Sequence, residues 1–419
     1  MSSASAAQGK PAQTEHGRVT SWLQRLESPV TTYYVLLSVT AVLVIIGLIM
    51  VLSASAIVSY KNSDSSYTIF LRQMQFAIVG AIALLLVSRL SVSRWKSLGV
   101  PALLGAMGLQ LLVFTPLGKS VNGNTNWISL GPLTIQPSEF AKLGLVLFGA
   151  AVLTRKRKLI GQFKHALVPF VLPFAALAIC LVLLGGDLGT VLVMCAIVAA
   201  VLFTAGVSWR LFAAGGLGFG LLAAVMVLTS ANRLGRLDVW LGKDTDPFGA
   251  ARQPIHGRYA LADGGWWGVG LGASREKWQW LSEPHNDFIY AIIGEELGLP
   301  GTLVVLALFA VLALVCYRLV LRTDDLFIRL ATGGVMAWII VQAMINIGAV
   351  IGLLPVIGVP LPLVSSGGSS LVTTMLALGM LLSFARQEPG CAEALAARPS
   401  VVRRSLAVLP AGRARRSPR

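Results

Sequence analysis

Asp287 is the residue whose position most strongly suggests chemistry. It ends a long polar loop and directly precedes the apolar residues 288–293 of an otherwise very hydrophobic chain. An ionisable group at such a boundary is costly to desolvate, so it usually faces a water-filled cavity and has a function. A carboxylate held in this way can act as a general base. We therefore predict that Asp287 is catalytic. The alternative is that it caps the helix that begins at Phe288.

Four other charged residues are expected at the same membrane level as Asp287: Glu139, Lys142, Asp187 and Glu283. Glu139 and Lys142 are three residues apart, so on a helix they share one face. We predict that they line the same cavity as Asp287, and the alternative is a structural ion pair. Asp187 precedes another apolar segment and can cap its helix, line the cavity or do both.

Nearby acids and histidines are given structural roles. Glu295 and Glu296 lie about two turns beyond Asp287, which places them roughly 12–14 Å further into the membrane, and we expect them to join helices. His256 and His285 are expected near the outer face, where lone loop histidines more often form hydrogen bonds than act as bases. The glycine-rich residues 264–272 lack a preceding strand, which argues against a dinucleotide site. The chain also lacks a Walker-type loop and a Ser/His/Asp order.

The composition indicates that the candidate residues belong to a membrane protein. The chain has 419 residues, of which 55% are hydrophobic and 12% charged, whereas a soluble domain has roughly 25% charged residues. A bilayer core of about 30 Å takes roughly 20 apolar residues per helix. We predict an all-α, polytopic integral membrane protein with about ten transmembrane helices. The ten apolar segments are residues 34–54, 73–87, 98–116, 138–153, 167–184, 188–205, 211–230, 288–318, 330–350 and 366–384.

The net charge is +16, but the basic residues are spread over several breaks between apolar segments and do not form one patch for nucleic acid. Lys and Arg concentrate in alternate breaks, as in cytoplasmic loops, which places both termini in the cytoplasm. We expect a polar N-terminal segment (residues 1–30) without a signal peptide, a transmembrane domain (31–385) and a basic tail (386–419). The tail is expected to be disordered, and the alternative is contact with anionic membrane lipid. None of the four cysteines falls in an outer loop, so we predict no structural disulfide.

Three outer segments are richer in polar residues, glycine or proline than simple connectors need to be. Residues 118–139 and 352–370 are short and contain several helix breakers. At membrane depth, such backbone persists only where it packs in protein or lines water. Residues 231–287 form the longest break and contain seven Arg or Lys and several Trp, so we predict an ordered, functional extracytoplasmic loop.

At these positions the chain resembles the SEDS (shape, elongation, division and sporulation) family of membrane glycosyltransferases. The resemblance covers residues from about 34 to 384. It is carried by Trp-Ile-Ser-Leu-Gly at 127–131, Gln-Pro-Ser-Glu-x-x-Lys at 136–142, Asp-Leu-Gly-Thr at 187–190, the glycine-rich run at 264–277, His-x-Asp-Phe-Ile-x-Ala at 285–291, Gly-Glu-Glu-Leu-Gly at 294–298, Asn-Ile-Gly at 346–348, Gly-Leu-Leu-Pro at 352–355 and Ser-x-Gly-Gly-Ser-Ser at 365–370. The chain departs from the family pattern at Asn126, Gly186, Asn286 and Ser366, and none of these changes removes an acid.

The resemblance implies polymerisation of lipid II, the undecaprenyl-diphosphate-linked disaccharide-pentapeptide, at the outer membrane face. Asp287 would then be the general base that takes a proton from the attacking sugar hydroxyl. The leaving diphosphate needs positive charge, which Lys142, Arg252, Arg258, Arg275 or Lys277 could supply, or a divalent cation (Mg or Mn) held by Asp287. The substrate-binding residues implied by the matched motifs are Glu139, Lys142, Asp187, Arg252, Arg258, Ser274, Lys277, His285 and Ser369.

The same resemblance implies a location and partners. The chain is more similar to the cell-division member than to the elongation member, so we expect it in the bacterial cytoplasmic membrane at the division septum. The implied partners are a class B penicillin-binding protein transpeptidase, other membrane proteins of the divisome and undecaprenyl-diphosphate-linked glycan. The main rival is a flippase or transporter of the lipid-linked precursor, which would need a polar lining across the whole bilayer. The second rival is a non-catalytic scaffold.

Overall fold

The computed structural model describes residues 28–397 apart from 122–123, 132, 247–248, 250 and 279. Within these residues, helices form at all ten predicted apolar segments. Eight spans are long and apolar enough to cross a membrane, and α8 is a shorter apolar helix. The prediction of an all-helical, multi-pass membrane protein is therefore confirmed. The ten helices are α2 (Thr31–Ser63), α3 (Thr68–Val87), α4 (Val92–Leu112), α5 (Pro137–Arg155), α7 (Ala176–Leu184), α8 (Leu188–Thr204), α9 (Trp209–Leu228), α12 (Ile289–Arg322), α13 (Leu326–Val350) and α14 (Gly368–Ala385).

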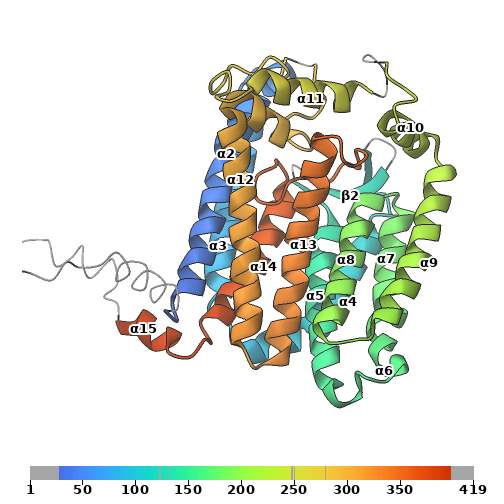
Figure 1. The fold of residues 1–419 in the computed structure, drawn as a ribbon, viewed down its shortest axis with the longest axis vertical. Helices are drawn as coiled ribbons and strands as arrows, with labels where there is room; N and C mark the ends of the chain where they lie inside the picture. The colour runs from blue at the N-terminus through green and yellow to red at the C-terminus, as the bar shows by residue number, and fades with distance from the viewer. Residues whose placement is uncertain are drawn as a thin grey trace, which may run out of the picture.

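Shorter elements lie at the two ends of this bundle (Figure 1). At the end predicted to be outer lie α10 (Ala231–Trp240) and α11 (Arg252–Gly264), together with an antiparallel sheet of β1 (Gly118–Val121), β2 (Asn124–Leu130) and β3 (Leu133–Ile135). At the opposite end lie η1 (Arg157–Leu159), α6 (Phe163–Leu167), the π-helical η2 (Phe170–Ala175) that leads into α7, and α15 (Cys391–Ala397).

Two of these elements differ from the sequence predictions. We predicted no strands, although the Asn-Gly pair at 122–123 between β1 and β2 is a strong hairpin signal. The helix α15 falls in the tail that we expected to be disordered, so that expectation is wrong for residues 391–397. Cys391, at the start of this helix, is fully buried. The rest of the predicted tail, and residues 1–27, lie outside the described residues.

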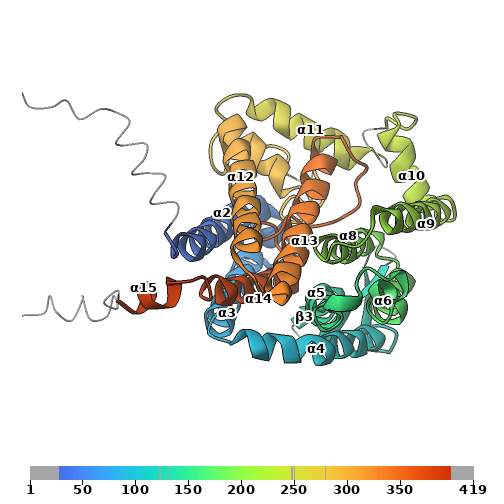
Figure 2. The same ribbon diagram turned by 60° about the horizontal axis from the view of Figure 1, so that its bottom comes forward.

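Among the membrane-length helices, α14, α5 and α13 have the largest buried shares, and α5 and α13 lie between other helices of the bundle (Figure 2). Trp338 of α13 is completely buried. Gly144 allows α5 to approach α4 closely, since a Cβ at this position would lie 2.9 Å from the Cα of Leu103. Small residues serve this purpose in membrane helices, where backbones must meet without a hydrophobic driving force. In contrast, α9 stands at the edge of the bundle and has no buried residue.

The helix α12 bends sharply at Gly298, whose φ of 66° is outside the helical range. The hydroxyl of Tyr290 donates a hydrogen bond to the carbonyl of Thr302, 3.3 Å away. Twelve residues of straight helix would separate these two groups by about 18 Å, so the first two turns of α12 must fold back beside the next turn. Glu295 and Glu296 therefore lie next to the bend. The prediction that they lie two turns further into the membrane than Asp287 is wrong.

Candidate active site

The backbone around Asp287 is fixed by α13 and by the irregular residues 352–367. Asn346 of α13 donates from Nδ2 to the carbonyls of Asp287 and Val359, each 2.8 Å away. Ser365 donates from its hydroxyl to the Asn286 carbonyl at 2.6 Å, and the Ser366 N–H donates to the His285 carbonyl at 2.9 Å. Since Asn346 lies one turn before the end of α13, Asp287 is held about one turn below the outer end of this helix.

The irregular segment is itself held by buried amide side chains. Gln73 of α3 donates from Nε2 to the Ser365 carbonyl and accepts from the Gly367 N–H, both at 3.2 Å. Gln342 of α13 donates to the Pro360 carbonyl at 3.0 Å. Backbone polar groups without helical partners must find such partners when they lie among membrane helices. The predicted packing of this helix-breaking segment inside the protein is therefore confirmed.

The Asp287 carboxylate is buried at one oxygen and lacks a partner there. Its Oδ1 atom has no hydrogen bond among the described residues, and neither does Oδ1 of Asn346. Both residues line a small cavity of about 10 Å³, close to the size of one water molecule. The pKa of Asp287 is raised to about 7, mainly by burial and also by the charge of Glu283, while Arg236 opposes the shift. Asp287 does not cap α12, because Phe288 occupies the cap position and no side chain caps it.

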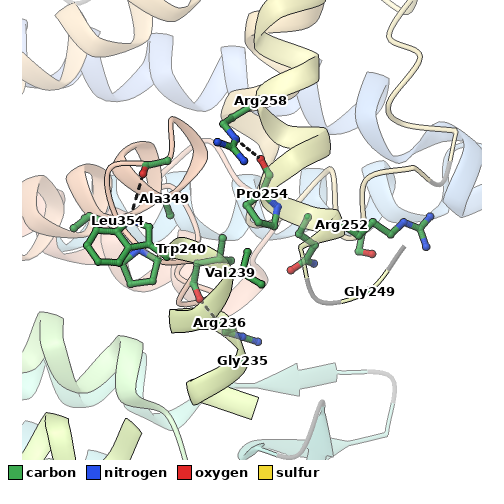
Figure 3. Close-up of a pocket in the computed structure, with 15 residues that line it drawn as sticks. Gly235, Arg236, Val239, Trp240, Gly249, Arg252, Pro254, Arg258, Ala349 and Leu354 are labelled. Atoms are coloured by element: carbon green, nitrogen blue, oxygen red, sulfur yellow. Dashed lines mark hydrogen bonds between the residues drawn. The ribbon is translucent and has the colours of Figure 1, made fainter. Parts of the chain in front are cut away.

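A larger cavity of about 480 Å³ adjoins the small one, and Ala349 and Val356 line both. Figure 3 shows that its walls come from α10, α11 and the residues after α13. Its charged lining residues are Arg236, Arg252 and Arg258, with no Asp or Glu among the lining residues. The cavity is therefore suited to an anionic group, and it lies next to the one carboxylate that we predicted to be catalytic.

Of the predicted substrate-binding residues, Arg252 and Arg258 line this cavity. Arg252 donates from Nε to the Trp280 carbonyl at 2.9 Å, and Arg258 donates to the Pro254 carbonyl at 3.2 Å. His285 is two residues from Asp287, with its Nε2 atom 3.8 Å from a carboxylate oxygen of Glu283. Burial lowers the pKa of His285, which Glu283 partly opposes.

Ser274 and Lys277 lie beside the bend in α12 and do not line the large cavity. Lys277 is 3.0 Å from the Glu296 carboxylate, and Ser274 donates to Glu295. Ser53 of α2 also donates to Glu296, at 2.6 Å. The structural role predicted for the two glutamates is thus confirmed, since they join α2 and the outer loop to α12. Ser274, Lys277 and the two glutamates are buried, so Ser274 and Lys277 hold the loop and are not exposed to a substrate.

Glu139 and Lys142 form a completely buried ion pair with a separation of 2.7 Å. Lys142 also donates to Gln342 at 3.0 Å and lies 4.9 Å above the ring of Trp338. Neither residue lines the large cavity. These contacts favour the structural alternative over the predicted binding role, because the Lys142 charge is already matched inside the bundle.

Asp187 and Ser369 are also occupied by contacts within the protein. Asp187 caps α8: it accepts from the Thr190 N–H at 2.9 Å, and its other oxygen accepts from the Thr190 hydroxyl and the Gln136 amide. The capping alternative is therefore confirmed. Ser369 is buried and accepts from the Gln136 N–H at 3.2 Å. Neither lines the large cavity.

We predicted no site role for Arg236 or for the Asn346 side chain from the sequence. Arg236 lies among many other basic residues of the long loop, so charge counting could not single it out. Asn346 stands in an apolar stretch before a helix-breaking segment, and a buried amide at that point is a signal that could have been used. The described residues contain no group of three or more His, Cys, Asp or Glu that could hold a metal ion. The free oxygens of Asp287 and Asn346 could supply two ligands of the kind that Mg²⁺ or Mn²⁺ prefers.

Comparisons with known proteins agree on one family. A family model for FtsW, RodA and SpoVE, described as "Cell cycle protein", matches residues 17–389. The chain is 38% identical over 381 residues to a protein of Mycobacterium tuberculosis named probable peptidoglycan glycosyltransferase FtsW, covering 91% of this chain and 72% of the relative. It is 39% identical over 353 residues to stage V sporulation protein E of Bacillus subtilis, covering 84% and 96%.

Solved structures share the fold. A chain from a study of structural coordination of polymerization and crosslinking by a peptidoglycan synthase complex matches with a TM-score of 0.68 at 28% identity, covering 84% of this chain and 97% of that one. The rod shape determining protein RodA of Thermus thermophilus matches with a TM-score of 0.62 at 25% identity, covering 84% and 96%.

Proposed function

The chain belongs to the FtsW/RodA/SpoVE family of cell cycle proteins, the SEDS family, and on this basis we propose that it is a peptidoglycan glycosyltransferase that polymerises lipid II. The observation that carries the proposal is the Asp287 carboxylate, whose Oδ1 atom is buried and unpartnered among the described residues, beside a cavity lined by arginines. A base and a cationic pocket are the two features that this transfer needs. Two relatives named probable peptidoglycan glycosyltransferase FtsW support the same assignment.

The proposed chemistry uses Asp287 as the general base. The acceptor sugar hydroxyl attacks the anomeric carbon of the donor, and Asp287 takes its proton in the transition state, which contributes roughly 10²–10⁴-fold to the rate. The donor loses its lipid diphosphate, whose growing negative charge the cavity arginines stabilise. A divalent cation bound beside Asp287 would supply further positive charge for the diphosphate.

The rate of polymerisation is expected to depend on the protonation of Asp287. A base must be deprotonated to act, and burial raises the pKa of this group to about 7. The rate should therefore reach a plateau above pH 7 and fall about tenfold for each pH unit below it. The measurement is the initial rate of polymerisation between pH 5.5 and 8.5, with protein integrity checked at each pH. A rate that stays constant down to pH 5.5 would exclude a base with this pKa.

A methyl group at Gly358 is expected to disturb the site. Its Cβ would lie 3.5 Å from Oδ2 of Asp287, in the space next to the carboxylate. We expect the Gly358→Ala variant to polymerise at least about tenfold more slowly, because small displacements of reacting groups cost up to roughly 10²-fold. The positive φ of 80° also makes any side chain here strained, by about 1–2 kcal/mol.

Gly390→Ala is the matched control for this strain. Gly390 has a φ of 78°, and its Cβ would lie 3.6 Å from Pro29 at the opposite end of the bundle. The two variants should lose similar thermal stability, but only the Gly358 variant should lose activity beyond that loss. Equal activity in both variants would mean that the space beside Asp287 is not used by substrate.

The site is proposed to face the outside of the bacterial cytoplasmic membrane, with both termini in the cytoplasm. Both ends of the described chain lie at the end of the bundle away from Asp287, and the basic loops support this orientation. A role at the division septum, beside a class B penicillin-binding protein and other divisome membrane proteins, is supported by the relatives named FtsW and by the peptidoglycan synthase complex.

The flippase alternative is less well supported by the cavities. A carrier of lipid-linked sugar needs a polar route across the bilayer, whereas the 480 Å³ cavity lies at one end, among α10, α11 and the residues after α13. The charged pair deeper in the bundle, Glu139 and Lys142, is buried and matched within the protein.

The direct test of the proposed function is polymerisation of purified lipid II by the purified full-length protein, with and without its class B penicillin-binding protein. We expect glycan strands whose formation requires this chain. If lipid II stays monomeric in both conditions while the protein remains folded, the proposed function is wrong.

A further inference from the structure

Arg236 lies next to Asp287, on the opposite side of a shared space. A Cβ on Gly358 would be 3.5 Å from Oδ2 of Asp287 and 4.0 Å from Nη1 of Arg236. Both groups therefore face the space that a side chain at Gly358 would occupy. Arg236 comes from α10, while Asp287 precedes α12, and the fold alone brings them together. The Arg236 Nη1 atom donates to the Val356 carbonyl at 3.3 Å, which holds the side chain at the wall of the large cavity (Figure 3).

Arg236 has no described carboxylate in direct ion-pair contact, and its charge acts on the nearby Asp287 only across the shared space, as a lowering of the Asp287 pKa. Among the described residues it forms no ion pair, although its side chain is half-buried. The other charged residues that line the cavity, Arg252 and Arg258, have the same sign. A partly desolvated cation without a partner is costly, and proteins usually place an anion against it. A guanidinium also has five N–H donors, of which the Val356 carbonyl uses one.

Reaction geometry decides which arginine can act on the leaving group. In a transfer, the attacking oxygen must come within about 3–3.5 Å of the anomeric carbon, which still carries the departing oxygen. The base and the cation for the leaving group must therefore flank one carbon atom. Asp287 and Arg236 flank the space at Gly358 in this way. Arg252 and Arg258 line the same cavity, but neither has an atom within 4 Å of a Cβ at Gly358.

We propose that Arg236 binds the diphosphate of the donor lipid beside Asp287 and stabilises the charge that develops as this diphosphate leaves. The inference rests on the proposed function. Asp287 takes the proton of the acceptor hydroxyl while the oxygen of that hydroxyl bonds to the anomeric carbon of the donor. The bond from that carbon to the diphosphate breaks, and its electron pair goes to the diphosphate oxygen that faces Arg236. Bidentate hydrogen bonds make arginine well suited to a phosphate group.

The test is equilibrium binding of undecaprenyl diphosphate to the purified full-length protein in detergent, followed by polymerisation kinetics with lipid II. Arg236→Met should weaken binding roughly 10- to 100-fold, because it removes charge-assisted hydrogen bonds. It should also lower kcat, whereas Arg236→Lys should keep part of both by retaining the charge. Binding measured without turnover separates this inference from the proposed function.

Arg233→Met is the matched control. Arg233 lies one turn earlier on α10, donates to the carbonyls of Gly186 and Met226, and does not line the cavity. The Arg233→Met variant should bind undecaprenyl diphosphate as tightly as the wild type does. If Arg236→Met binds this lipid as tightly as the wild type and changes only the pH profile, Arg236 merely tunes Asp287 and the inference is overturned. If the wild type itself fails to polymerise lipid II, the proposed function fails separately.

Discussion

Asp287→Asn is expected to slow glycan polymerisation by roughly 10²–10⁴-fold, the contribution of a general base. Asparagine keeps the shape of the side chain but cannot accept the proton of the acceptor hydroxyl. The contacts that position this residue are to its backbone, from Asn346 to the Asp287 carbonyl and from Ser365 to the neighbouring carbonyl, so they survive the change. The measurement is the initial rate with purified lipid II, at matched protein concentration and thermal midpoint.

Glu283→Gln is the control for this prediction. Glu283 is an exposed acid on the same loop, four residues before Asp287, and the proposed chemistry gives it no role. At pH 8, above the pKa of Asp287, this variant should keep a rate within a few-fold of the wild type, because Asp287 is deprotonated there with or without the charge of Glu283. Substantial activity in Asp287→Asn, together with a normal thermal midpoint, would show that another residue is the base.

Lys142→Met is expected to cause the largest loss of stability, about 3–5 kcal/mol, the usual cost of breaking a buried ion pair. The substitution leaves the Glu139 carboxylate charged and unpaired among α5, α13 and α14. It also removes one of the two donors to the Gln342 amide oxygen, leaving the Trp338 indole. Thermal unfolding of the purified protein measures the loss, and a shift of only a degree or two would contradict it.

The double variant Glu139→Gln with Lys142→Met separates a structural pair from a substrate-binding pair. Removing both charges leaves no buried unpaired ion, so much of the lost stability should return, with a favourable coupling between the two changes. If the pair is structural, polymerisation should return with stability. If the double variant is stable but inactive, the binding role that we predicted from the sequence is correct after all.

The helices were predictable because membrane burial leaves a strong signal in the sequence. Each apolar segment of about 20 residues became a helix, since only internal hydrogen bonding satisfies the backbone in lipid. The loop 352–367 was predictable for the complementary reason that its prolines and glycines forbid a helix. The catalytic candidate could also be chosen from its position, and its burial at the wall of a cavity agrees with that choice.

The remaining features depended on contacts between distant residues. The bend at Gly298 could not be predicted, because the sequence at 294–298 is compatible with one continuous helix. The bend changes the depth that we expected for Glu295 and Glu296. Lys277 and Arg236 are both basic residues of the long loop. Lys277 forms an ion pair with Glu296, whereas Arg236 forms no ion pair among the described residues and lines the large cavity. Sequence spacing cannot distinguish them, because the partner of each is set by tertiary packing.

We propose that this chain polymerises lipid II at an outward-facing site built around Asp287. This claim is tested most directly in sealed vesicles that contain the purified protein and its class B partner with the Asp287 end outward. Lipid II is then supplied only to the outer leaflet. We expect glycan strands to form outside with the wild type and not with Asp287→Asn. Transfer of unpolymerised lipid II to the inner leaflet by the wild type, without strand formation, would contradict the claim and favour a flippase.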